Sequence, residues 1–143
     1  MLSLQNRRFA SSVILGLILL VGNFGAYAQW AGIASSADRG GYDVYLDPSL
    51  SASFDGVANI WLLFDFKVTQ KTKTTPYSSY KIQMEIDCKN RIGRILGYMD
   101  FLERMGEGMP VRTNSAPQNW TPLIPDGKDR ILWNAACSPH QWT

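Results

Sequence analysis

Apolar and polar residues alternate strictly in two long segments near the middle of the chain. In residues 57–69 every second position is apolar, and this row comprises Ile60, Leu62, Phe64, Phe66 and Val68. Residues 80–88 repeat the pattern, and their apolar row comprises Tyr80, Ile82, Met84, Ile86 and Cys88. A period of two places successive side chains on opposite faces of a strand. Both segments are therefore predicted to be β-strands with one buried face.

Further strands are predicted on either side of this pair. Residues 91–102 form a third long segment, in which we expect Ile92, Leu96 and Tyr98 to share one face. Residues 42–46 alternate in the same way and stop at Pro48, which cannot donate to a sheet ladder. The polar or Gly- and Pro-rich stretches between them are expected to be loops, namely residues 35–41, 70–76 and 106–118.

The pattern changes to helical spacing near the C-terminus. Asp126 is the expected N-cap, and Asp129 three residues later gives an acidic variant of the capping box. The predicted helix begins at Gly127 and ends at about Cys137, and its apolar stripe comprises Ile131, Leu132, Ala135 and Ala136. The expected fold class is therefore α+β, an antiparallel meander of about five or six strands with this helix packed on it.

The first 28 residues have the organisation of a secretory signal peptide. Arg7 and Arg8 precede an apolar run at residues 13–25, and Ala26-Tyr27-Ala28 supplies small residues before the expected cleavage between Ala28 and Gln29. A retained membrane anchor is the alternative, but a spanning helix needs about 20 predominantly apolar residues. We expect a signal peptide at 1–28, a single domain at 29–143, and a periplasmic or secreted protein with no membrane anchor after cleavage.

Removing the signal peptide also removes the excess positive charge. The whole chain has 14 basic and 12 acidic residues, and residues 1–28 contain two of the basic residues and none of the acidic ones. The remaining 12 and 12 charges balance. A neutral domain without a basic stripe argues against a nucleic-acid partner.

The two cysteines, Cys88 and Cys137, both lie in the expected mature domain. An even pair in an exported protein favours a disulfide, which would close a loop of about 50 residues and stabilise the fold by roughly 3–4 kcal/mol. The alternative is a metal site, but zinc requires more ligands than two cysteines and His140, the sole histidine, provide. We expect no metal and no cofactor.

No catalytic constellation emerges from the residue types and their spacing. A nucleophilic site would need a base beside Ser or Cys, and His140 lies in the short tail after Cys137. A glycosidase would need two carboxylates across one cleft, whereas Glu85 and Asp87 share a face with Lys81 and Lys89, which favours cross-strand ion pairs. The interpretation is a non-enzyme with no catalytic residues, and an unrecognised hydrolase is the weaker alternative.

Aromatic residues suggest where a partner could bind. Trp61 and Tyr45 lie on faces opposite the clearest apolar rows, and the polar connector at residues 70–76 resembles a recognition loop. The candidate binding surface therefore comprises Trp61, Tyr45, Lys71, Lys73 and Tyr77. The alternative is a purely structural role, in which the helix or the N-terminal strand buries these rings.

The order of these features resembles the surface-adhesin protein E family. The segments that carry the resemblance are residues 45–49 (YLDPS), 60–66 (IWLLFDF), 85–91 (EIDCKNR) and 120–122 (WTP), with the helix that ends at Cys137. The resemblance implies a small exported Gram-negative bacterial domain with a disulfide between sheet and helix. It also implies a surface adhesin that binds host matrix proteins and can form a homodimer.

These observations lead to an exported binding module that acts by protein–protein contact. Its partner would be a host matrix protein or an envelope protein. The family's best-known member is a lipoprotein, whereas this chain has Gln29 where a lipid-anchored protein has Cys. The alternative function is therefore a periplasmic accessory protein of an envelope assembly with no adhesive role.

Overall fold

The computed structural model describes residues 30–138, and its centre is a long antiparallel hairpin. Strand β4 (Val57–Lys71) pairs with β5 (Pro76–Asp87), and a short turn at residues 72–75 joins them. One face of the paired strands is buried apart from the half-buried Tyr80, as the alternating pattern predicts, and residues 62–66 are buried on both faces. The 70–76 connector is thus mostly strand and turn, because the two strands extend their pairing towards the tip.

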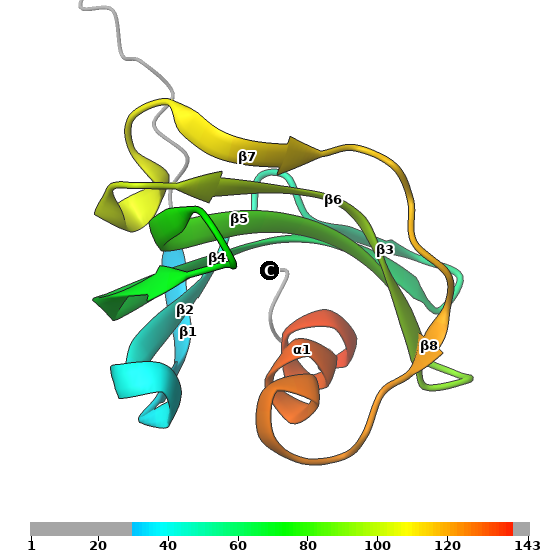
Figure 1. Cartoon of the computed structure of the whole chain (residues 1–143). Helices are drawn as coiled ribbons and strands as arrows, with labels where there is room; N and C mark the ends of the chain where they lie inside the picture. Colours follow the sequence, from blue (N-terminus) through cyan, green and yellow to red (C-terminus); the bar gives the residue numbers. More distant parts are fainter. Residues whose placement is uncertain (1–29, 139–143) are drawn as a thin grey trace, which may run out of the picture.

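The remaining strands extend this hairpin into one antiparallel sheet. Its order is β1-β2-β4-β5-β6-β7, with β3 paired to β4 and β8 paired to β6 (Figure 1). The bounds of these strands are β1 Ala31–Ser36, β2 Tyr42–Leu46, β3 Ala52–Phe54, β6 Ile92–Phe101, β7 Pro110–Asn114 and β8 Thr121–Pro122. Two short 3-10 turns interrupt the path, η1 at Asp38–Gly40 and η2 at Arg104–Gly106. The predicted antiparallel meander with one C-terminal helix is confirmed.

Strand β7 and the last two residues of β1 lie in segments that were predicted as loops. Strand β1 includes residues 35 and 36, and β7 lies inside the expected loop 106–118. Both are edge strands in which few residues are buried, so their sequences need not alternate. Backbone pairing with β2 and β6 makes them strands, and the composition of the segments gives no sign of it.

The predicted face of β6 is wrong beyond its middle. Met84 pairs with Ile95 and Gln83 pairs with Gly97, so Leu96 is an extra residue and forms a β-bulge. Ile95 and Tyr98 consequently pack against the same core, whereas strict alternation places them on opposite faces.

Polar side chains fix the turns at two strand ends. Asp47 Oδ1 accepts hydrogen bonds from the backbone N–H of Ser49 and Leu50, which folds the chain back just after β2. Asp87 accepts bonds from the backbone N–H of Lys89 and Asn90 in the same way after β5. Both aspartates belong to the segments that resemble the adhesin family.

Helix α1 (Gly127–Cys137) lies against one face of the sheet, here called the helix-side face (Figure 1). Leu132, Ala135 and Ala136 are buried there, as the predicted stripe requires, and Ile131 is partly buried. The expected capping box is wrong in detail. Asp126 stands at the N-cap without a side-chain bond, while Asp129 Oδ2 accepts the backbone N–H of Ile124.

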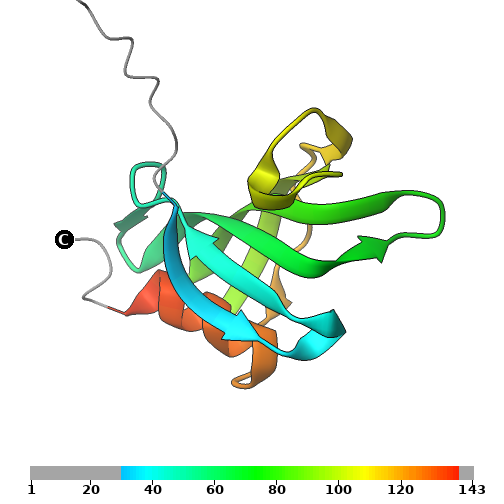
Figure 2. The same cartoon turned by 90° about the vertical axis from the view of Figure 1, so that its left-hand side faces the viewer.

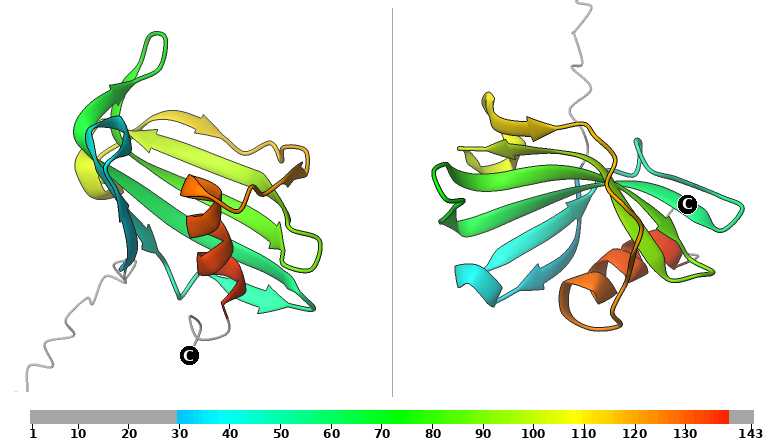
Figure 3. Two further views of the ribbon diagram at one scale, coloured as in Figure 1. Left: turned by 90° about the horizontal axis from the view of Figure 1, so that it is seen from below. Right: turned by 45° about the vertical axis from the view of Figure 1, so that its right-hand side comes forward.

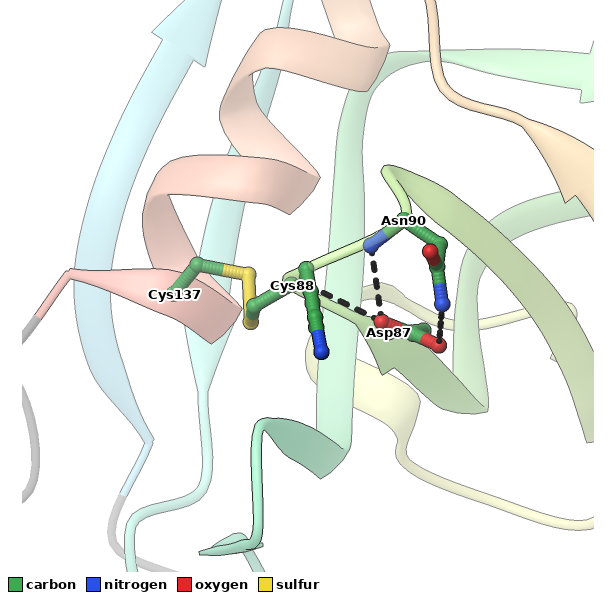
Figure 4. Close-up of a disulfide and its surroundings, with 5 residues drawn as sticks. Asp87, Cys88, Asn90 and Cys137 are labelled. Carbon is green, nitrogen blue, oxygen red and sulfur yellow. Dashed lines mark hydrogen bonds between the residues drawn. A yellow bond between two sulfur atoms is a disulfide. The ribbon is translucent and has the colours of Figure 1, made fainter.

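The predicted disulfide joins Cys88, just after β5, to Cys137 at the end of α1 (Figure 4). Their Cα atoms are 5.6 Å apart and 49 residues separate them in sequence. The bond holds the C-terminal end of the helix at the end of the hairpin. Asp87 and Asn90, which order the neighbouring turn, lie beside it in the same view.

Candidate functional site

Helix α1 covers only part of the helix-side face. It runs beside β4 and β5, with Cys137 fixed at Cys88 and Lys128 in its first turn near Phe64. Seen from the helix side, the sheet continues past the N-terminal end of α1 towards the β4–β5 turn (Figure 3). This uncovered part is the candidate site.

The uncovered part is lined by aromatic residues and is here called the aromatic groove. Its rings are contributed by four neighbouring strands and comprise Tyr42, Phe64, Phe66, Tyr77, Tyr80 and Tyr98. Three cationic side chains border it, namely Arg39 in η1, Arg112 in β7 and Lys128 in α1. Figure 2 shows that η1 and the start of α1 lie on the same side of the sheet.

Strand register explains why these rings gather. Phe64 pairs directly with Tyr80 and with Val44, and Tyr42 pairs with Phe66, so their side chains leave the same face. The Phe64 and Tyr80 rings stack with centroids 4.6 Å apart, and Tyr77 meets Phe66 edge-on at 5.7 Å. Such contacts hold the aromatic floor in defined rotamers.

Two adjacent hollows of about 180 Å³ each open in the groove. The first lies over β5 and β6 beside Tyr98 and Arg112, and the second lies between η1, β2 and β4 beside Arg39. Tyr80 and Lys128 line both hollows. The groove is thus a pair of shallow depressions that share a central tyrosine and a central lysine.

The charges around the groove are unequally compensated. Arg112 donates to Asp100 Oδ2 at 2.6 Å, and this hydrogen bond raises the pKa of Arg112. Lys128 and Arg39 form no ion pair within residues 30–138. Burial lowers the pKa of Lys128, Asp129 opposes the change, and the nearby charge of Arg39 lowers it further. The Lys128 ammonium lies 5.8 Å from the centre of the Phe64 ring.

Four tyrosine hydroxyls of the groove are available to a ligand as far as residues 30–138 are concerned. In the part of the chain that the structure describes, no hydrogen bond reaches the hydroxyl of Tyr42, Tyr77, Tyr80 or Tyr98. Burial raises the pKa of Tyr80, and the neighbouring Tyr77 adds to this, so the Tyr80 hydroxyl stays protonated at physiological pH. These groups can donate to, or accept from, a bound ligand.

The opposite, outer face of the sheet is sealed behind the groove by η2. Asp65, which is only 1% exposed, accepts bonds from Arg104 Nη2 at 2.6 Å and from the backbone N–H of Met105 at 2.7 Å. Ser79 also holds this loop, because its hydroxyl donates to the Glu103 carbonyl and accepts from the Gly106 N–H. The loop therefore covers the outer side of the same strands that form the groove.

The structure does not gather the predicted binding residues into one surface. Trp61 and Tyr45 are half-buried on the outer face, and Lys71 and Lys73 are exposed at the β4–β5 turn. Tyr77 is buried on the helix-side face, where it contacts Phe66 and Tyr80. Of the five, only Tyr77 contributes to the aromatic groove.

Several groove residues escaped the sequence analysis. The alternating pattern marked Phe64, Phe66 and Tyr80 as core, and they are core-facing, but it could not show that α1 stops short of them. Arg39 lies in a segment expected to be loop, and Lys128 lies in the polar first turn of the helix. The available signal was the aromatic character of the core row near the hairpin turn.

Three carboxylates on the neighbouring strands β4, β5 and β6 have ion-pair partners. Asp65 binds Arg104, Asp100 binds Arg112, and Glu85 binds Arg94 at 2.6 Å. The expected cross-strand ion pairing is confirmed for Glu85, because its partner Arg94 lies opposite it on β6, while Lys81 donates to the Gly106 carbonyl.

The described residues 30–138 offer neither a metal-binding cluster nor a membrane-spanning helix. No group of three or more His, Cys, Asp or Glu side chains in this part of the chain could hold a metal ion. The same residues contain no helix of the length and apolar character needed to cross a membrane. The expected cleavage site at Ala28 and Gln29, and also His140, lie outside the described residues.

Comparison with known protein families identifies the family of the chain. The model of the surface-adhesin protein E family matches residues 30–138, which are nearly all of the expected mature domain. The chain belongs to this family. Membership makes it an adhesin-like protein of exported or surface-localised type that binds a protein or host ligand, and it suggests a non-enzyme.

A solved structure supports the fold of this adhesin-like chain. Haemophilus influenzae protein E, in its crystal form II, superimposes with a TM-score of 0.54 and 13% sequence identity. The alignment covers 66% of this chain and 80% of that one. At this identity the likeness concerns the fold alone. No curated protein matches the sequence.

Proposed function

We propose that this chain is an exported, non-enzymatic binding module that attaches to a protein partner through the aromatic groove. The partner is a host matrix protein or an envelope protein. The observation that carries the proposal is the uncovered, tyrosine-rich end of the helix-side face. Tyrosine is enriched among the residues that dominate binding energy at protein interfaces, because it combines a large rigid ring with a hydroxyl.

Family membership supports the same conclusion independently of the groove. The signal peptide at 1–28 and cleavage between Ala28 and Gln29 remain part of the proposal. They would deliver a domain of balanced charge outside the inner membrane. Its attachment would then depend on local contacts in the groove, since a neutral domain has little long-range attraction for a charged surface.

The test measures binding of residues 29–143 to a panel of purified extracellular matrix proteins. Tyr98→Ala should weaken the strongest interaction by about 10-fold or more, because it removes a half-buried ring from the groove. Trp61→Ala, on the outer face, is the matched aromatic control and should leave binding within about 2-fold.

Localisation separates the adhesin from a periplasmic accessory protein. Protease added to intact cells should digest the mature protein if it is displayed. Protection from the protease, together with absence of binding to every matrix protein at micromolar concentration, would contradict an adhesive role. Equal losses in Tyr98→Ala and Trp61→Ala would contradict the assignment to the groove.

A further inference from the structure

We propose that the aromatic groove binds an acidic peptide segment of its partner, with one carboxylate side chain held between two apolar side chains. This inference rests on the proposed function, since it names the chemistry of the partner segment that would occupy the same site. Four features of the groove carry it, which are its unpaired cations, its two hollows, its free hydroxyls and its limited positive charge.

Two cations that form no ion pair within residues 30–138 line the same hollow. Arg39 belongs to η1 and Lys128 to the first turn of α1, and both line the hollow above Tyr42, Phe64 and Phe66. Arg39 is close enough to depress the pKa of Lys128. Asp38 borders the same hollow but forms no ion pair with either cation within the described chain. Two neighbouring like charges over an apolar floor repel each other, and a carboxylate between them relieves this repulsion.

The two hollows of the groove are sized for separate side chains of a ligand. Pockets for drug-sized molecules are generally about 300–1,000 Å³, so hollows of about 180 Å³ suit single side chains better. One hollow lies on each side of Tyr80 and Lys128. Two apolar side chains can occupy the hollows while the carboxylate between them meets Lys128.

The tyrosine hydroxyls supply the remaining contacts. A peptide backbone brings one N–H donor and one carbonyl acceptor per residue, and burying them without partners is costly. The hydroxyls of Tyr42, Tyr77, Tyr80 and Tyr98 have no partner within residues 30–138 and can satisfy such groups. This complementarity favours a peptide over a purely apolar ligand.

The limited charge argues against a polyanion. Arg112 is already bonded to Asp100, so Arg39 and Lys128 are the cations of the described groove that lack a carboxylate partner. Nucleic acids and sulfated glycans are bound by stripes of many basic residues. A groove with two available cations and two side-chain-sized hollows suits a single acidic residue with apolar neighbours.

The test uses purified residues 29–143 and short fluorescent peptides. The first peptide has Glu between two Phe residues in a Gly- and Ser-rich background, and its partners replace the Glu by Lys or both Phe by Ser. We expect the acidic aromatic peptide to bind with a Kd of about 100 μM or tighter, and each replacement to weaken it by about 10-fold. Lys128→Glu and Arg39→Glu should each cause a similar loss.

Charge reversals outside the groove serve as controls for a non-specific effect of charge. Arg130→Glu reverses a charge on the same helix, outside the groove, and Lys73→Glu does so at the β4–β5 turn, and both should bind the acidic peptide normally. Equal binding of the acidic and basic peptides, or no binding up to about 1 mM, would overturn the inference.

The inference and the proposed function can fail separately. If Tyr98→Ala abolishes attachment to a matrix protein but Lys128→Glu does not, the groove binds its partner without an acidic segment. A heparin fragment that binds more tightly than the acidic peptide, and loses affinity in Lys128→Glu, would replace the peptide by a sulfated glycan. Either result overturns the acidic-peptide inference and leaves the binding module intact.

Discussion

Lys128 is an exposed residue whose ammonium is partly desolvated at the edge of the groove. Its ammonium lies beside the Phe64 ring, and it has no carboxylate partner within residues 30–138. Burial lowers its pKa from the ordinary value of 10.5, so the charged form is less favourable in the folded chain than in the unfolded one. Between the lowered pKa and 10.5 the unfolded chain holds more protons at this residue, and stability therefore rises with pH across that window.

Replacing this lysine by an uncharged residue of similar length should raise stability and weaken binding of the acidic peptide. We expect Lys128→Met to raise Tm at pH 7 slightly, and the gain should shrink as pH approaches 10, where the wild-type lysine loses its charge. The same variant should bind the acidic peptide less well. Thermal unfolding at several pH values checks the first effect, and a Tm gain that does not vary with pH would contradict the explanation from desolvation.

At the scale of elements, the two ends of α1 are held in place by different contacts. Its C-terminal end is fixed by the disulfide, whereas at its N-cap the Asp126 side chain makes no capping bond and Asp129 bonds the preceding segment instead. An eleven-residue helix is marginal on its own, so tertiary contacts and the disulfide must hold it.

Loss of the disulfide should consequently affect the whole fold. We expect the double variant Cys88→Ser, Cys137→Ser to lose about 2–5 kcal/mol of unfolding free energy, because the unfolded chain regains the freedom of a long loop. Denaturant unfolding measures this loss. Wild-type protein unfolded with a thiol reductant should match the variant, and an oxidised wild type of equal stability would show that the bond contributes nothing.

The same elements show how far the sequence could be interpreted. The long strands and the helix were predictable because the spacing of their apolar residues shows which face is buried. The disulfide was predictable because two cysteines in an exported domain favour a disulfide. The edge strands β1 and β7 were not, because pairing with a neighbour requires no special side chains. The bulge at Leu96 shifts the register, and Gly97 directly after it is the one local sign of the irregularity, which strict alternation over residues 91–102 ignores. The groove depends on where α1 ends relative to Phe64, which is a tertiary distance that no local pattern encodes.

At the scale of the whole molecule, the helix-side face has two parts with different roles. The part under α1 contains the fully buried Ile60 and Ile86, which share one core with Leu132 of the helix, and it accounts for much of the packing. The uncovered part contains rings that keep some solvent access, including Tyr80 and Tyr98. Stability and binding are therefore divided along the length of the same strands.

This division can be measured with two truncations. Leu132→Ala should cost about 2–5 kcal/mol of stability, since it leaves a cavity between helix and sheet. Tyr98→Ala should cost less than half as much, because solvent already reaches its ring, but it should impair binding far more. Denaturant unfolding and peptide titration of both variants test the prediction. Similar losses of stability and similar losses of affinity in the two variants would contradict it.

The η2 loop has a consequence for the stoichiometry of binding. Because Asp65 and Ser79 fasten this loop over the outer side of the strands that form the groove, that end of the sheet is accessible from one side only. The rings of Phe64, Phe66 and Tyr80 thus meet a ligand in a single orientation, and a second ligand cannot approach them from behind. The groove of one copy of the domain can accordingly hold one ligand segment at a time, so adhesion through the groove would gain strength when many copies act together.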